Sequence, residues 1–196
     1  MNKVAVLLLG LVVFSSGCAI THPVAKDYDA HLMKYGYEKT LPMTGMEAGY
    51  FLDPGTKRHS YEFRAASVGY AHVWVVEFGK ILDKTLQAHY VQSAFGELDR
   101  GVRGQDDSGY LIEFNLTSFE FKDYRAHTAL DITVRRDGDK VFEKLYTSEG
   151  QSQGAQMWMA GVFGMKNATL KSTKQSIDAI LEQFILDLRA REIGSD

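Results

Sequence analysis

The stretch from Tyr110 to Ser148 constrains the fold more than any other part of the chain. Apolar and polar residues alternate along residues 110–121 and again along 124–136, which is the pattern of strands buried on one face. Asp137-Gly138 follows, a pair that tolerates the positive φ angles of a tight hairpin. Residues 141–148 supply the returning strand. The sequence therefore predicts an antiparallel meander with one buried face and one partly hydrated face.

Two amphipathic helices are predicted, over residues 79–95 and 167–191. Apolar side chains recur at helical spacing in both, with Gly96 as the stop of the first helix and Asn167 as the N-cap of the second. His89 falls on the apolar side of the first helix, where we expect a satisfied core residue. Two helices and a meander predict an α/β fold of the α+β type. It is a two-layer sandwich, with a mainly antiparallel sheet and both helices on one face.

The first seventeen residues have the form of a secretory signal peptide. Lys3 precedes an apolar run from Val4 to Phe14, and small residues follow it. The run has eleven residues, whereas about 20 are needed to span a bilayer. The segment is therefore predicted to be a signal sequence and not a transmembrane helix.

Cys18 is the only cysteine, and it stands where cleavage of such a signal would occur. The sequence Ser15-Ser16-Gly17-Cys18 resembles the lipobox of bacterial lipoproteins, with serine at a first position that is often leucine. The resemblance implies that Cys18 is acylated, with palmitate among its chains, and begins the mature protein. Ala19 in place of aspartate implies the outer membrane, facing the periplasm. The alternative is an ordinary signal peptide followed by an isolated cysteine.

Three segments follow from these patterns. Residues 1–17 are the signal peptide, residues 18–58 are a lipidated N-terminus and lead-in, and residues 59–193 are a periplasmic α/β domain. The lead-in contains all three prolines and a candidate short helix over 27–37. Residues 60–78 are expected to be extended, and 97–103 are a further candidate strand.

Composition excludes several classes of function. Loss of Lys3 with the signal leaves 21 basic and 25 acidic residues, a net charge of −4, so nucleic acid is not an expected partner. None of the six histidines has a partner at a metal-ligand spacing. The carboxylate pairs Asp106/Asp107 and Asp137/Asp139 fall in predicted loops, where turn chemistry explains them. We therefore expect no metal, no cofactor and no enzymatic activity.

One segment offers a candidate interaction patch. Glycines at 150, 154, 161 and 164 alternate with large apolar residues, and methionine supplies adaptable apolar contact. The segment is either core, folded back under the sheet, or an exposed contact for a partner protein or a membrane. The candidate residues are Met157, Trp158, Met159, Phe163 and Met165.

The order of features resembles a group of small Gram-negative lipoproteins, the YajG-like and ABC-transport auxiliary lipoproteins. The resemblance covers residues 60–190. It rests on the lipobox, the helix from Gly79 to Phe95, the hairpin at Arg136-Asp137-Gly138-Asp139, and the terminal helix with Ala179, Leu181, Phe184 and Leu188. It implies a non-enzymatic adaptor or accessory subunit of a cell-envelope transport or assembly machine. A lipid- or glycan-binding envelope component is the alternative. The membrane and an envelope protein are the expected partners, and an oligomer is compatible with both functions.

Overall fold

A computed structural model describes residues 19–36, 39–65, 69–101 and 109–194, and for residues 155–160 it describes the backbone alone. Its centre is a five-stranded sheet in the order β5-β2-β6-β7-β8. The three long strands are β6 (Tyr110–Lys122), β7 (Arg125–Arg136) and β8 (Asp139–Glu149), and they pair antiparallel. The predicted meander is confirmed. Asp137 and Gly138 take φ angles of 51° and 86° in its hairpin.

The other two strands of this sheet add parallel pairing. β2 (Glu47–Leu52) pairs parallel with both β6 and β5 (Glu97–Arg100). A smaller sheet has the order β1-β4-β3, in which β1 (Ile20–Pro23) pairs parallel with β4 (His72–Val76) and β3 (Tyr61–Phe63) pairs antiparallel. The α+β class is confirmed. The share of parallel pairing exceeds the expectation because β1 and β2 come from the N-terminal segment.

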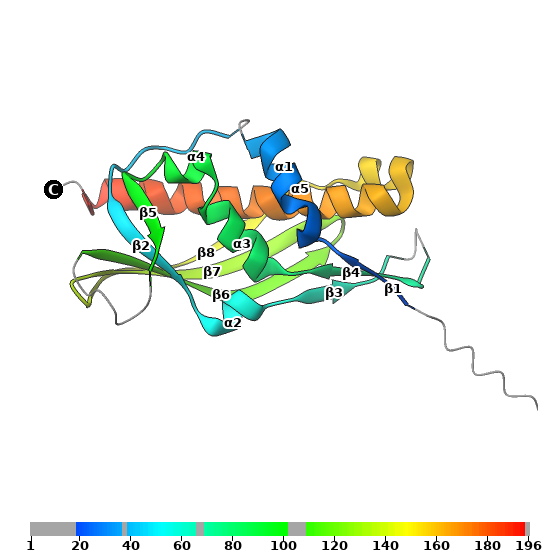
Figure 1. The fold of residues 1–196 in the computed structure, drawn as a ribbon, viewed down its shortest axis with the longest axis horizontal. Coiled ribbons are helices and arrows are strands. Elements are labelled where there is room, and N and C mark those ends of the chain that lie inside the picture. The colour runs from blue at the N-terminus through cyan, green and yellow to red at the C-terminus, as the bar shows by residue number, and fades with distance from the viewer. Residues whose placement is uncertain (1–18, 37–38, 66–68, 102–108, 195–196) are drawn as a thin grey trace, which may run out of the picture.

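The helices gather mainly on one side of the sheets (Figure 1). α1 (Tyr28–Tyr35) follows the short 3-10 turn η1 (Ala25–Asp27), and α3 (Phe78–Leu86) and α4 (His89–Gln92) lie near it. The long α5 (Gly154–Ala190) runs along β7 and β8. α2 (Pro54–Arg58) contacts α3 and β6, with the Asp53 carboxylate capping its first turn.

The core lies between α5 and the sheet. Phe184 of α5 is fully buried among three aromatic rings, with ring centroids 6.3 Å from Phe114, 5.9 Å from Phe142 and 6.1 Å from Tyr146. α3 also contacts α5, and Tyr90 of α4 donates to Asp178 in its middle, so the middle of α5 packs between the sheet layer and a helix layer. Among the described residues, no helix is both long and apolar enough to cross a membrane.

Both predicted helices have different boundaries in the structure. The segment 79–95 is divided because Ala88 is extended, with φ −69° and ψ 141°, which separates α3 from α4. The last helix begins at Gly154 and not at Asn167, which lies inside it. The prediction of Asn167 as N-cap was wrong, because helical structure continues through the glycine-containing segment.

The lead-in belongs to the domain that the sequence analysis began at residue 59. The expected helix over 27–37 corresponds to α1, but β1 and β2 also lie within residues 18–58, and both are paired strands. Val24, Tyr28, Met46 and Tyr50 from this segment are buried in the core. An early segment completes both sheets, so from Ile20 onward the described part of the lead-in is built into the fold.

Candidate functional site

The expected interaction patch lies at the start of α5, and the structure divides it. Phe163 has 81% of its surface exposed, whereas Met165 has 1% and belongs to the core. Residues two apart in a helix point to nearly opposite sides, so both cannot share one surface. The assignment of Met165 to the patch was wrong. The backbone places Met157, Trp158 and Met159 in the first turns of α5, but their side chains lie outside the described residues.

Gly161 changes the direction of α5 just before Phe163. Its φ of 54° and ψ of −136° depart from helical geometry, and L-residues with a side chain rarely adopt this combination. The turns before Gly161 therefore form a separate arm at the end of the long helix. Asn167 and the rest of the helix continue without a second break.

Exposed apolar side chains gather at the end of the molecule where α5 begins. Ile20 opens β1, Tyr70 precedes β4 and Tyr124 lies in the β6–β7 turn, with exposed fractions of 50%, 70% and 37%. Figure 1 shows the start of β1, the start of β4 and the start of α5 at this same end. The four residues Ile20, Tyr70, Tyr124 and Phe163 are called the apolar end below.

Hydrogen bonds fix these segments to their neighbours in the fold. The Ile20 amide donates to the Ala71 carbonyl at 2.8 Å. The Arg64 guanidinium donates to the carbonyl of Tyr70. The Gln153 amide, just before α5, donates to the Tyr124 carbonyl at 3.1 Å. The start of β1 is thus tied to the residues before β4, and the β6–β7 turn is tied to the residues before α5.

A hollow of about 280 Å³ opens at the apolar end. The rings of Phe63 and Phe121 stack at 4.9 Å beside it, and Met165 and Tyr124 line it as well. Arg64 and Lys122 are exposed at its edge. The hollow combines an apolar lining with two cations, and it is smaller than typical ligand pockets of about 300–1,000 Å³.

Two histidines meet beside β1, a contact that sequence spacing did not reveal because 50 residues separate them. Nε2 of His22 lies 2.8 Å from Nδ1 of His72, and the His22 ring stacks on Trp74 at 5.4 Å. Burial lowers the pKa of His22, and the nearby His72 and Lys166 lower it further. Within the described ranges, no three His, Cys, Asp or Glu side chains gather as metal ligands. The hydrogen bond between the two rings fixes β1 against β4.

The other face of the large sheet carries a wide polar groove of about 720 Å³. His127, Glu120 and Glu149 line it with the hydroxyls of Ser118 and Thr147. Glu149 pairs with His127 at 3.2 Å and with Arg125 at 3.1 Å, and the hydrogen bond from Arg125 is the main cause of the lowered pKa of Glu149. A β-bulge between Leu116 and Ser118 lies in the strand beside it.

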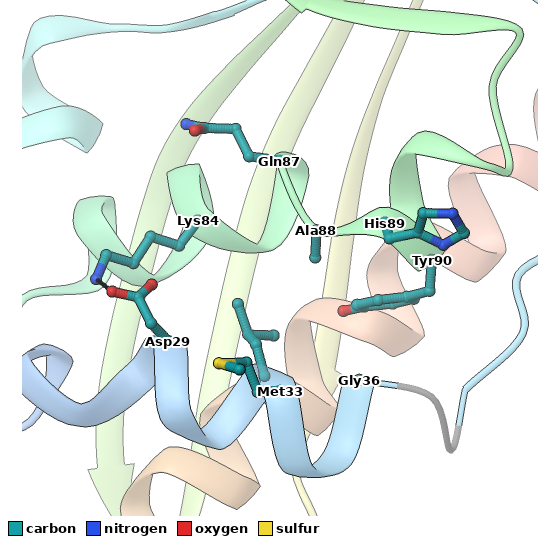
Figure 2. Close-up of a pocket in the computed structure, with 9 residues that line it drawn as sticks. Asp29, Met33, Gly36, Lys84, Gln87, Ala88, His89 and Tyr90 are labelled. Atoms are coloured by element: carbon teal, nitrogen blue, oxygen red, sulfur yellow. Dashed lines mark hydrogen bonds and ion pairs between the residues drawn. The ribbon is translucent and has the colours of Figure 1, made fainter.

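A second hollow of about 320 Å³ lies between α1 and the α3–α4 segment (Figure 2). The Lys84 ammonium and the Asp29 carboxylate meet across it at 2.6 Å, and the exposed Met33 borders it. His89 lines the rim and is exposed. The expectation of a core His89 was wrong, because the break at Ala88 turns the first residue of α4 toward solvent.

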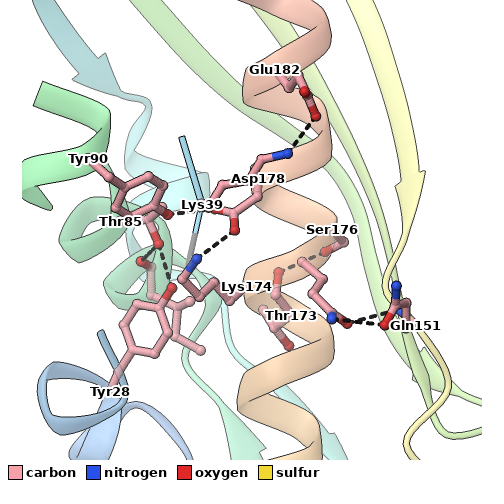
Figure 3. A network of polar contacts seen from close by, with 12 residues as sticks. Tyr28, Lys39, Thr85, Tyr90, Gln151, Thr173, Lys174, Ser176, Asp178 and Glu182 are labelled. Carbon is pink, nitrogen blue, oxygen red and sulfur yellow. Dashed lines mark hydrogen bonds and ion pairs between the residues drawn. The ribbon is translucent and has the colours of Figure 1, made fainter. Parts of the chain in front are cut away.

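A buried polar network joins α5 to the helices above it (Figure 3). The Lys174 ammonium donates to Asp178 at 2.6 Å, and the Tyr90 hydroxyl donates to the same carboxylate at 2.5 Å. Burial raises the pKa of Tyr90, and so does the negative charge of Asp178. Beside it, the Tyr28 hydroxyl lies 2.7 Å from Thr85. The polar groups of this network bond to one another, so we assign the network a structural role.

The remaining carboxylates singled out from the sequence play no common role. Asp137 lies in the β7–β8 hairpin, where its carboxylate accepts from the Gly109 amide at 2.9 Å. Asp139 opens β8 and is exposed. Asp106, Asp107 and Cys18 lie outside the described residues.

Comparison with known proteins adds a likeness of fold. No family model matches the chain, and no curated protein matches it. The crystal structure of protein XCC0632 from Xanthomonas campestris, assigned to the family DUF330, is similar, with a TM-score of 0.50 and 13% sequence identity. The match covers 78% of this chain and 90% of that one. At this identity the likeness is one of fold, and the chain shares its α+β architecture with a DUF330 protein.

Proposed function

We propose that this protein is an outer-membrane lipoprotein that faces the periplasm and acts as a non-enzymatic adaptor or accessory subunit of a cell-envelope transport or assembly machine. Its anchor is Cys18, acylated after removal of the signal sequence. The resemblance to the auxiliary lipoproteins of envelope transporters supports the class of machine. The domain's task is to hold a partner close to the membrane.

The observation that carries the proposal is the position of β1. Strand pairing begins at Ile20, and the strand is fixed to β4 over four residue pairs. Cys18 precedes that strand by two residues, so an acyl chain there would hold the folded domain directly. An adaptor needs this arrangement, because its docking surface must stay near the membrane-bound machine.

The uncovered face of the sheet is the best candidate for partner docking. Leu145 of β8 points away from the core, since its neighbour Tyr146 is buried, and it is exposed together with Val141. β8 is also an edge strand, and edge strands offer unpaired backbone groups to another chain.

Two experiments test the proposal in cells. Labelled palmitate should be incorporated into the wild-type chain and not into Cys18→Ala, which should also leave the membrane fraction. A photocrosslinking residue at Leu145 should then capture one envelope protein, whereas the same residue at Gln183, exposed on α5, should not. Absence of acylation would refute the anchor. Acylation with no specific adduct from position 145 would count against the adaptor.

The glycan-binding alternative is favoured by the polar groove. Its hydroxyls, its carboxylates and the Tyr61 ring are the groups that contact sugars, and its volume of about 720 Å³ lies in the range of ligand sites. Soluble peptidoglycan fragments should bind the purified protein and lose affinity in Glu149→Gln but not in Glu143→Gln, an exposed residue of the same strand. Equal binding by all three proteins, or none, would exclude this groove.

A further inference from the structure

We infer that the apolar end is a membrane-contact surface, which rests on the phospholipid bilayer and inserts Phe163, Tyr124, Tyr70 and Ile20 into its interfacial region. The inference deepens the proposed function and rests on the acyl anchor at Cys18. It adds a second attachment, made by the folded domain, that sets the orientation of the protein on the membrane.

The length of chain between anchor and fold is the first argument. Ile20 lies two positions after Cys18, and an extended chain spans at most about 7 Å over that length. Ile20 is held in place by its own pairing with His72. An acylated Cys18 would therefore keep the start of β1, and everything at its end of the molecule, within the headgroup layer or next to it.

The chemistry of the exposed side chains is the second argument. Phe163 is the most exposed large apolar residue among those described, and it is in the same helix whose other side is buried core. Tyrosine suits the boundary between lipid and water because its ring is apolar and its hydroxyl is polar. Interfacial elements bury such groups about 5–10 Å into the headgroup region. Bulk water is a poor environment for this set, and a bilayer surface accommodates it.

Two cationic side chains at the apolar end can bind lipid phosphate groups, in a contact that is otherwise apolar. Arg64 and Lys122 are exposed at the edge of the hollow there, and long cationic side chains can reach phosphate groups while their stems stay in apolar surroundings. Asp123 lies in the same turn. The apolar side chains therefore carry the contact, and the two cations add attraction to anionic headgroups.

The other end of α5 supplies a matched control. Leu186 is also an exposed apolar residue of this helix. It lies 23 residues after Phe163, about 35 Å further along the helix axis. A membrane that touches Phe163 does not reach Leu186 in this arrangement.

The test uses the full lipidated chain in vesicles of phosphatidylethanolamine and phosphatidylglycerol. Cys18 is the only cysteine, and acylation consumes its thiol, so a cysteine introduced as Phe163→Cys, Tyr70→Cys or Leu186→Cys is a unique site for an environment-sensitive fluorophore. Thermal unfolding by circular dichroism verifies that each variant is folded. Quenching is then measured with lipids brominated on the acyl chains and with aqueous iodide.

We expect labels at positions 163 and 70 to shift to the blue, to lose fluorescence with brominated lipid and to be protected from iodide. The label at 186 should show the reverse. If the protein floats with the vesicles but the label at 163 is quenched only by iodide, the membrane contact is refuted while the anchor stands. Protection from both quenchers would assign the surface to a second copy of the chain and would also refute it. Failure to float would refute the anchor itself.

Discussion

Replacing Lys174 by methionine should destabilise the protein far more than loss of a surface charge. The Lys174 and Asp178 side chains are only 6% and 9% exposed, and their charged atoms lie 2.6 Å apart. Lys174 also lies 4.5 Å from the centre of the Tyr90 ring. Lys174→Met leaves the Asp178 carboxylate buried with the Tyr90 hydroxyl as its remaining side-chain partner in this network.

The magnitude follows from desolvation. Breaking one side of a buried ion pair costs about 3–5 kcal/mol, because the other charge stays buried without compensation. Replacing the whole cluster by apolar residues, as Lys174→Met, Asp178→Leu and Tyr90→Phe together, should recover most of that loss. An exposed pair gives a control. Lys140 and Glu143 lie 2.5 Å apart with nearly half of each side chain exposed, so Lys140→Met should cost less than about 1 kcal/mol.

Urea unfolding of the mature chain measures these differences, with the fully buried Trp74 as a fluorescent reporter. The free energy of unfolding should fall strongly for the single variant and return toward wild type for the triple variant, with an unchanged denaturant slope. A loss below about 1 kcal/mol for Lys174→Met would mean that water reaches the pair. It would refute the enclosure of α5 between two layers.

Three further predictions concern stability. Burial, with Lys174 and other lysines nearby, lowers the pKa of His31 from 6.5 to about 4. The contribution of neutral His31 to the free energy of unfolding is complete above pH 6.5 and should fall by up to about 3 kcal/mol as the pH drops toward 4. In His31→Gln the urea midpoint should change less over this pH range than in the wild type. A Cβ on Gly79 would lie 2.2 Å from the Thr56 carbonyl oxygen, so Gly79→Ala should cost about 1–3 kcal/mol or more. Gly154→Ala, which has no neighbour closer than 3.7 Å, should be neutral or stabilising in the same urea assay. Phe184→Ala should lower the free energy of unfolding by about 3–5 kcal/mol. Phe163→Ala should leave the thermal midpoint nearly unchanged. A large drop of the midpoint in Phe163→Ala would place Phe163 in the core.

The sequence predicted well where the pairing is local. β6, β7 and β8 follow one another along the chain, and the Asp137-Gly138 turn fixes their register. β2 was missed because its partners, β5 and β6, lie about 50 to 60 residues away and pair with it in parallel. A single strand of six residues, with Gly49 inside it, carries little signal of its own. Its place in the sheet depends on contacts that no local pattern encodes.

The start of α5 shows the opposite error, in which local signals were given too much weight. The prediction left the segment with glycines at 154, 161 and 164 outside the helix, because Asn167 suggested its start. The structure uses only Gly161 as a break, and helical structure is kept around it by packing such as that of Met165 in the core. Tertiary contacts override weak helix propensity here. Phe163 is exposed and Met165 is buried because the two residues point to opposite sides of the helix. A prediction that starts the helix at Asn167 does not place either of them on a helix.

α5 links the two surfaces on which the proposed function depends. After the break at Gly161 the helix continues to Ala190 for about 43 Å, with the apolar end at its beginning and the β7–β8 hairpin region near its far end (Figure 1). Its middle is fixed from both sides, by the sheet and by the network around Asp178. A rigid helix with one end at the bilayer would hold the uncovered sheet face at a defined height and orientation. Flexible tethering would lose this property, because a partner would then meet the sheet face at every angle. If Cys18 is acylated and the apolar end meets the bilayer as proposed, the fold itself sets the geometry of docking.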